Sequence, residues 1–132
     1  MTVQELKKII PWQELYVIEH SRELRKVLAN MADRISHIPA LYETDGKDAR
    51  CVLHYFDIAG AADWYVFEVD LETGEAFGFV TLSGKLDDPD AEYGYIDLVT
   101  LCKIARINLD LHFDGITKSD IQRQRYGELA VA

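Results

Sequence analysis

The stretch WYVFEVDLETGEAFGFVTL, residues 64–82, decides the fold class of this chain. Aromatic and β-branched residues dominate its two ends, 64–70 and 76–82, and both residue types favour β-strands. The link Glu72-Thr73-Gly74 between them is short and ends on glycine, as tight turns often do. The stretch therefore predicts a β-hairpin made of two antiparallel strands.

Successive side chains of a strand point to opposite faces, so the residues of the first run fall into two sets. We assign the first set to the core face: Tyr65, Phe67 and Val69. We assign the second set to the opposite face: Trp64, Val66, Glu68 and Asp70. The two carboxylates of the second set then become candidates for contact with a partner.

The chain on either side of the hairpin supplies further strands. Residues 50–56 have the same composition, a short strand is expected at 93–96, and a last one at 109–113. The links among the first strands are short, which favours antiparallel pairing. We therefore expect an antiparallel sheet of four to five strands.

A long helix is expected before the sheet. Apolar residues from Trp12 to Ile35 recur at steps of three, four and their sums, and charged residues fill the other face. Residues 36–39 would end this helix, because the residue before a proline is pushed out of helical geometry.

Capping signals predict shorter helices as well. Thr2 and Thr117 are each followed three residues later by an acid, as in a capping box, and Asp97 can cap a helix after the short strand. The predicted fold class is α+β, with the antiparallel sheet packed against the long N-terminal helix and two shorter helices. We expect a single domain over 1–132, helical in 1–37 and sheet-containing in 38–132.

Composition points to an ordinary globular protein. Hydrophobic residues make up 48% of the chain and charged residues 28%, and no apolar run is long enough to cross a bilayer. The start of the chain carries charges and shows no signal peptide, so we expect a cytoplasmic protein. Cys51 and Cys102 stand among apolar neighbours, which predicts buried, reduced thiols.

Negative charge is concentrated in the middle of the chain. Residues 1–50 hold eight acids and eight bases, whereas residues 51–101 hold eleven acids against Lys85 alone and net minus ten. Such a field repels phosphate backbones and attracts basic protein surfaces. Direct nucleic-acid binding is therefore not expected, and a basic protein surface is the expected partner.

Five short pieces of the chain share the spacing of one family. They are Pro39, Leu41, Tyr42 and Thr44; Trp64, Tyr65, Glu68 and Asp70; Phe77, Gly78 and Val80; Glu92, Gly94, Tyr95, Leu98 and Leu101; Asp110, Leu111, His112 and Phe113. On these residues the chain from Ile38 to Phe113 resembles domain-of-unknown-function family number 2958, a bacterial family often encoded on mobile elements. Leu109 departs from its pattern, which has Arg there. The resemblance implies a mobile-element setting and no established catalytic residues.

One constellation could support chemistry. Asp110, His112 and Asp114 would alternate along one face of the expected last strand, and a His flanked by carboxylates can bind a metal or act as a general base. A further ligand would have to come from Glu68 or His54. One alternative function is therefore a small divalent-metal-dependent hydrolase or nuclease. No metal or cofactor is expected, because no complete ligand set is identifiable.

No nucleophile elbow or phosphate-binding loop indicates an enzyme. The leading hypothesis is a non-enzymatic, acidic protein-interaction module, encoded by a phage or plasmid, that inhibits a host nucleic-acid-handling defence protein by docking on its basic surface. Another alternative is a homo-oligomeric scaffold or immunity-type protein. The candidate partner-binding residues are Asp87, Asp88, Asp90, Glu92, Tyr93, Tyr95, Glu68 and Asp70.

Overall fold

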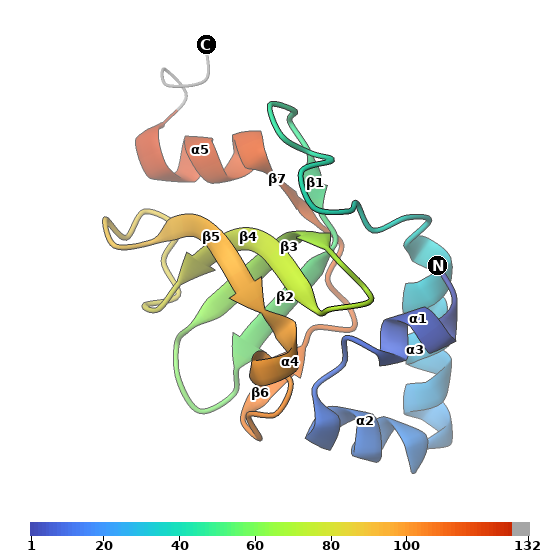
Figure 1. The fold of residues 1–132 in the computed structure, drawn as a ribbon. Coiled ribbons are helices and arrows are strands. Elements are labelled where there is room, and N and C mark those ends of the chain that lie inside the picture. Colours follow the sequence, from blue (N-terminus) through green and yellow to red (C-terminus); the bar gives the residue numbers. More distant parts are fainter. Residues whose placement is uncertain (128–132) are drawn as a thin grey trace.

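The computed structural model describes residues 1–127, and within them the chain forms an α+β fold (Figure 1). The helices are α1 (Val3–Lys7), α2 (Trp12–Glu19), α3 (Arg22–Arg34), α4 (Leu98–Leu101) and α5 (Lys118–Tyr126). The strands are β1 (Arg50–Cys51), β2 (Leu53–Asp57), β3 (Asp63–Val69), β4 (Glu75–Thr81), β5 (Glu92–Asp97), β6 (Ile107–Leu109) and β7 (Ile116–Thr117). No helix in this part of the chain is both long and apolar enough for a membrane span.

Five strands form the main sheet in the order β5-β4-β3-β2-β6, and every neighbouring pair is antiparallel. This confirms the predicted antiparallel sheet and the hairpin between β3 and β4. The hairpin turn is capped by Asp70, whose carboxylate accepts the backbone N–H groups of Glu72 and Thr73. The short strands β1 and β7 pair with each other in a separate ladder.

The two faces of the sheet are covered differently. Helices α1 to α3 lie beside one face, and α5 lies over the other (Figure 1). The larger hydrophobic cluster joins helix residues such as Leu6 and Met31 to Tyr55 and Val66 of the sheet. The smaller cluster joins Ile121 of α5 to sheet and loop residues. Both faces therefore bury apolar side chains, which requires apolar residues at consecutive strand positions.

A β-bulge in β3 corrects the predicted division of its side chains. Val66 pairs with Gly78 and Glu68 pairs with Phe77, so Phe67 has no residue opposite it. Phe67 is buried, as expected, but in the smaller cluster under α5, and Glu68 lies on that same side. Val69, predicted to share a face with Phe67, instead joins the larger cluster.

The predicted long N-terminal helix is wrong. The helix from Trp12 ends at Glu19, and Ser21 caps a second helix by accepting the backbone N–H of Leu24 at 3.2 Å. The apolar pattern has a step of six residues between Ile18 and Leu24, which is off the face of one straight helix. Breaking the helix there lets α2 and α3 each bury an apolar side.

The last strand of the main sheet is earlier and shorter than predicted. It ends at Leu109, and Asp110 forms a turn in which its carboxylate accepts the N–H of His112 at 3.0 Å. Asp110, His112 and Asp114 therefore do not project from one strand face. The capping boxes at Thr2 and Thr117 and the Asp97 cap are all confirmed.

Candidate interaction groove

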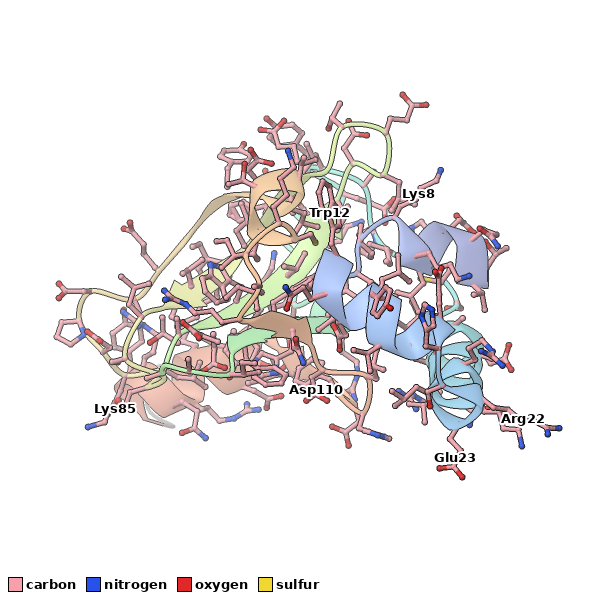
Figure 2. All side chains as sticks on the ribbon, turned by 90° about the horizontal axis from the view of Figure 1, so that it is seen from below. Lys8, Trp12, Arg22, Glu23, Lys85 and Asp110 are labelled. Carbon is pink, nitrogen blue, oxygen red and sulfur yellow. The ribbon has the colours of Figure 1, made fainter. Side chains whose placement is uncertain are left out.

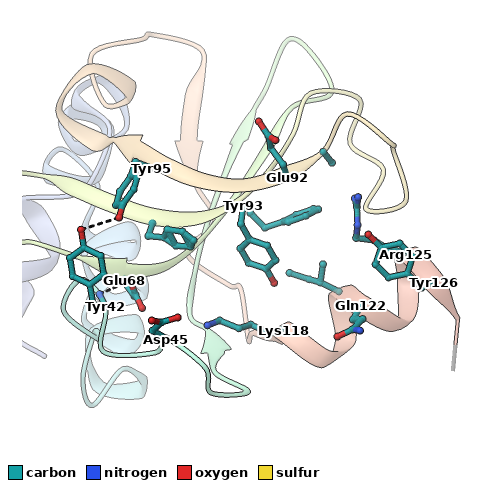
Figure 3. Close-up of a pocket in the computed structure, with 14 residues that line it drawn as sticks. Tyr42, Asp45, Glu68, Glu92, Tyr93, Tyr95, Lys118, Gln122, Arg125 and Tyr126 are labelled. Carbon is teal, nitrogen blue, oxygen red and sulfur yellow. Dashed lines mark hydrogen bonds between the residues drawn. The ribbon is translucent and has the colours of Figure 1, made fainter. Parts of the chain in front are cut away.

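A groove of about 730 Å³ opens between the β4–β5 side of the sheet, α5 and the loop 40–47 (Figure 3). Its apolar surface comes largely from rings on facing elements. The rings belong to Tyr42, Phe77, Phe79, Tyr93, Tyr95 and Tyr126. Charged side chains at the groove are Asp45, Glu68, Glu92, Lys118 and Arg125. We refer to this site as the aromatic groove.

Glu68 fixes the loop that forms one end of the groove. Its carboxylate accepts the backbone N–H groups of Tyr42 and Thr44, each at 2.9 Å, and the hydroxyl of Thr44. Burial of the carboxylate favours its protonated form, but these hydrogen bonds and the nearby Lys118 charge outweigh burial and lower its pKa. Glu68 is therefore an ionised anchor of the loop, and its oxygens already have partners.

Tyr42 holds an unusual backbone conformation at the groove. Its φ angle is 69°, in the left-handed region, and it alone among the non-glycine residues of 1–127 has a positive φ. Residues other than glycine have a steric cost at this φ angle. The hydrogen bonds from the loop to Glu68 therefore hold Tyr42 in a strained backbone conformation. The Tyr95 hydroxyl donates a hydrogen bond to the Tyr42 hydroxyl at 3.0 Å, which raises the pKa of Tyr95 (Figure 3). Both rings remain largely exposed.

Two cations fasten α5 along the opposite side of the groove. Lys118 Nζ donates to the Thr44 carbonyl at 2.8 Å, which ties the start of α5 to the loop 40–47. Arg125 donates to the carbonyl oxygens of Leu86 and Asp88 at 2.7 and 3.1 Å, and its guanidinium lies 5.2 Å from the Phe79 ring centre. Both cations therefore hold the walls of the groove in place.

The predicted partner-binding residues divide between the groove and its surroundings. Four of them line the groove: Glu68, Glu92, Tyr93 and Tyr95. Three lie in the loop before β5: Asp87, Asp88 and Asp90. Asp70 caps the hairpin turn and is not among the groove residues. Sequence reasoning missed Tyr42 and all of the α5 contribution, although Tyr42 belongs to one of the five family-like pieces.

The concentrated negative charge is only partly free to meet a partner. Asp57 pairs with Arg106 at 3.0 Å, Asp63 lies against His54, and Asp97 caps α4. Five other acids form no hydrogen bond or ion pair through their side chains within residues 1–127. They are Glu72, Glu75, Asp87, Asp90 and Glu92. All five belong to β4, β5 or the loops next to these strands, and Glu92 among them lines the aromatic groove.

A second cluster surrounds His54. Its Nε2 lies 2.6 Å from Asp63 Oδ1, its Nδ1 lies 3.6 Å from Asp110 Oδ2, and its ring stacks on Tyr65. His112 is exposed and bonds to Asp110 only through its backbone. Within residues 1–127, no group of three or more His, Cys, Asp or Glu side chains could hold a metal ion. Of the residues of the hydrolase alternative, His54 lies beside Asp110, whereas the His112 side chain is exposed and Glu68 bonds to the loop 40–47.

The two thiols are held in their neutral form. Cys51 and Cys102 are both free and buried, as predicted. Burial raises the pKa of each thiol to about 12. A thiolate nucleophile needs a lowered pKa, so neither cysteine has the surroundings of a catalytic nucleophile.

Comparison of the chain with models of known protein families, with curated proteins and with solved structures finds no match in any of the three. The resemblance of the chain from Ile38 to Phe113 to family number 2958 therefore stays a prediction. Support for a function therefore comes from the geometry of the aromatic groove and the charge around it.

Proposed function

We propose that this protein is a non-catalytic interaction module that binds a basic surface of a partner protein at the aromatic groove. The observation that carries the proposal is the exposure of Tyr42 and Tyr95, with 68% and 57% of their surface accessible, at the mouth of a groove bordered by free acids. Aromatic side chains at such a site provide large contact area at low entropic cost, and Tyr is enriched in interfaces.

Rigidity of the groove supports binding in preference to catalysis. Glu68, Lys118 and Arg125 are all occupied in holding the loops and α5, so none of them is free to transfer a proton. A groove whose walls are already fixed loses less entropy when a partner binds. Free acids beside it would attract basic partners and speed their association.

The resemblance to a mobile-element family extends this proposal to a class of partner. Proteins that handle nucleic acids carry basic surfaces for phosphate, and an acidic module can cover such a surface. We therefore propose that the partner is a nucleic-acid-handling host defence protein and that the module inhibits it.

The proposal can be tested by site-specific photocrosslinking. A benzoylphenylalanine at position 95 should crosslink a basic protein in an extract of the cells that encode the chain. The matched control places the same group at Tyr16, which is 66% exposed on α2 and lies outside the groove. The crosslinked partner is then purified, and its binding to the unmodified protein is measured at low and high salt.

Binding that is lost in Tyr95→Ala and retained in Tyr16→Ala would support the groove as the docking site. Equal crosslinking from the two positions, or binding indifferent to salt and to Tyr95, would contradict the proposal. A separate assay of the partner's nucleic-acid binding, with and without the protein, tests the proposed inhibition.

A further inference from the structure

The two edges of the main sheet differ in whether another element covers them. At the β6 edge, Glu14 of α2 accepts the backbone N–H of Leu109 at 2.7 Å, so a helix covers that edge. At the β5 edge, strand Glu92–Asp97 pairs only with β4, and its outward backbone groups bond to nothing else within residues 1–127. An open edge of six residues is a template for another strand.

Gly94 makes this edge unusually accessible. It stands at the middle of β5, and a Cβ added there would meet no atom within 4 Å. Its φ is not positive, so neither crowding nor backbone geometry within residues 1–127 requires glycine at this position. Glycine weakens a strand, and inside one it often marks a place where another backbone approaches closely.

Charge at the end of β5 indicates what kind of strand fits. Glu75 and Asp97 are cross-strand partners, and the exposed Tyr95 lies two residues before Asp97, whose carboxylate caps α4 by accepting the backbone N–H of Thr100. Like charges opposed in this way destabilise a sheet, and the Glu75 side chain bonds to no group in the described chain. A Lys or Arg from a partner would relieve the repulsion and could also lie over the Tyr95 ring.

A second copy of the chain fits this edge poorly. Antiparallel pairing of two β5 strands about their common centre would place Glu92 of one copy opposite Asp97 of the other, at both ends of the ladder. Both residues are exposed acids, so the new pair would add repulsion where the sheet already has it. The edge therefore favours a different chain that carries bases.

We propose that β5 accepts an extended basic segment of a partner protein as a sixth strand of the sheet. A Lys or Arg of that segment lies between Glu75 and Asp97, and a neighbouring apolar side chain enters the aromatic groove beside Tyr93. Backbone pairing then supplies affinity, and alternate side chains supply specificity. This inference rests on the proposed function, because it states how the groove engages its partner.

The probe is a displayed library of random ten-residue peptides selected on the intact protein. Selected peptides should combine Lys or Arg with alternating apolar residues. Each is then synthesised in two forms, N-methylated on one or the other alternate set of backbone amides. The set that faces β5 should weaken binding at least about tenfold when methylated, and the outward set should not, because only the first donates to the edge strand. Hydrogen exchange should slow at amides of Glu92–Asp97.

Charge is tested with Glu75→Gln combined with Asp97→Asn, since Asn retains the cap of α4. The matched control is Glu23→Gln with Asp33→Asn, two exposed acids of α3; Figure 2 places Glu23 at the end of the molecule opposite Lys85. Only the Glu75→Gln and Asp97→Asn pair should weaken the binding of the selected peptides. If peptides need Tyr95 but tolerate both methylated forms, strand addition is wrong and the proposed function stands. If no selected peptide depends on Tyr95, both are wrong.

Discussion

A single carboxylate on α2 should make the stability of the protein depend on pH. Burial raises the pKa of Glu14 to about 7, the Asp110 charge adds to the rise, and the hydrogen bond from Leu109 opposes it. Between pH 4.5, the ordinary pKa of a glutamate, and about pH 7, the folded protein keeps a proton that the unfolded chain releases. The free energy of unfolding therefore falls as pH rises through this window.

Glu14→Gln removes this titration while keeping an acceptor for the Leu109 N–H. We expect the variant to be more stable than the parent at pH 8, by on the order of 1 to 3 kcal/mol, and nearly equal to it at pH 4. Urea unfolding across this pH range measures the difference. Glu19→Gln, on the exposed side of the same helix, is the control. A constant difference between parent and Glu14→Gln at all pH values would contradict the prediction.

Substitutions of Tyr42 should affect the stability of the protein and its binding to the partner differently. Glycine adopts the φ of 69° without the steric cost that tyrosine pays, and the largely exposed ring of Tyr42 contributes little burial. We expect Tyr42→Gly to be more stable than Tyr42→Ala by about 1 kcal/mol in urea unfolding. Both variants should bind the crosslinked partner equally weakly, because both lack the ring. Binding by either variant as strong as that of the parent would show that the ring is not a contact.

At the level of elements, the contact between the sheet and α5 depends on Phe67. This side chain is 2% exposed and packs in the smaller cluster with Ile121. Phe67→Ala should lower the free energy of unfolding by roughly 3 to 5 kcal/mol, since it leaves a cavity in a small cluster. Thermal and urea melts measure this loss, with Leu82→Ala at an exposed position as the control. An unchanged melt would mean that α5 is not held through this cluster.

The bulge at Phe67 shows where sequence reasoning on elements fails. Alternation correctly located β3, but it assumed strict period two, and one extra residue moves every later side chain to the other face. Gly78 was one sequence signal of the bulge, because a Cβ at this position would lie 2.0 Å from the Tyr65 carbonyl oxygen. That contact exists only in the folded sheet, so the glycine could not have been interpreted from the strand alone.

Local signals were more reliable than long-range ones. The capping boxes at Thr2 and Thr117 depend on residues three apart, and the structure contains both. Ser21 has Leu24, not an acid, three residues after it, so no capping box marked the start of α3, and the apolar period extending past it favoured one continuous helix. No groove was predicted, and of the residues that line it only Glu68, Glu92, Tyr93 and Tyr95 were among the predicted partner-binding residues. Its other walls come from α5 and the loop 40–47, whose approach to β5 is a tertiary effect.

For the whole molecule, charge and groove lie together. The net charge of minus nine is not spread evenly, because acids in β2, β3 and the turns are occupied in local hydrogen bonds and ion pairs. Among the acids of residues 51–101, those that remain free belong to β4, β5 or the loops next to these strands. A partner that approaches the aromatic groove therefore meets the uncompensated part of the field first, and electrostatic attraction should act mainly on the rate of association.

Neutralising that border should slow binding without unfolding the protein. We expect Asp87→Asn, Asp90→Asn and Glu92→Gln together to lower the association rate of the crosslinked partner severalfold at low salt, with little change in dissociation. At about 1 M salt the screening length falls to about 3 Å, so parent and variant should converge. The melting temperature should hardly change, because these exposed side chains make no bond within residues 1–127.

The control replaces the same number of acids elsewhere, as Glu19→Gln, Glu23→Gln and Asp33→Asn on α2 and α3, which changes the net charge equally. If net charge alone attracted the partner, both triple variants would associate at the same reduced rate. If position decides, only the variant beside the aromatic groove is slow, because a field that decays over about 10 Å at 0.1 M salt acts locally. Equal rates in stopped-flow measurements at low salt would contradict this docking face and leave the tyrosines to account for the affinity.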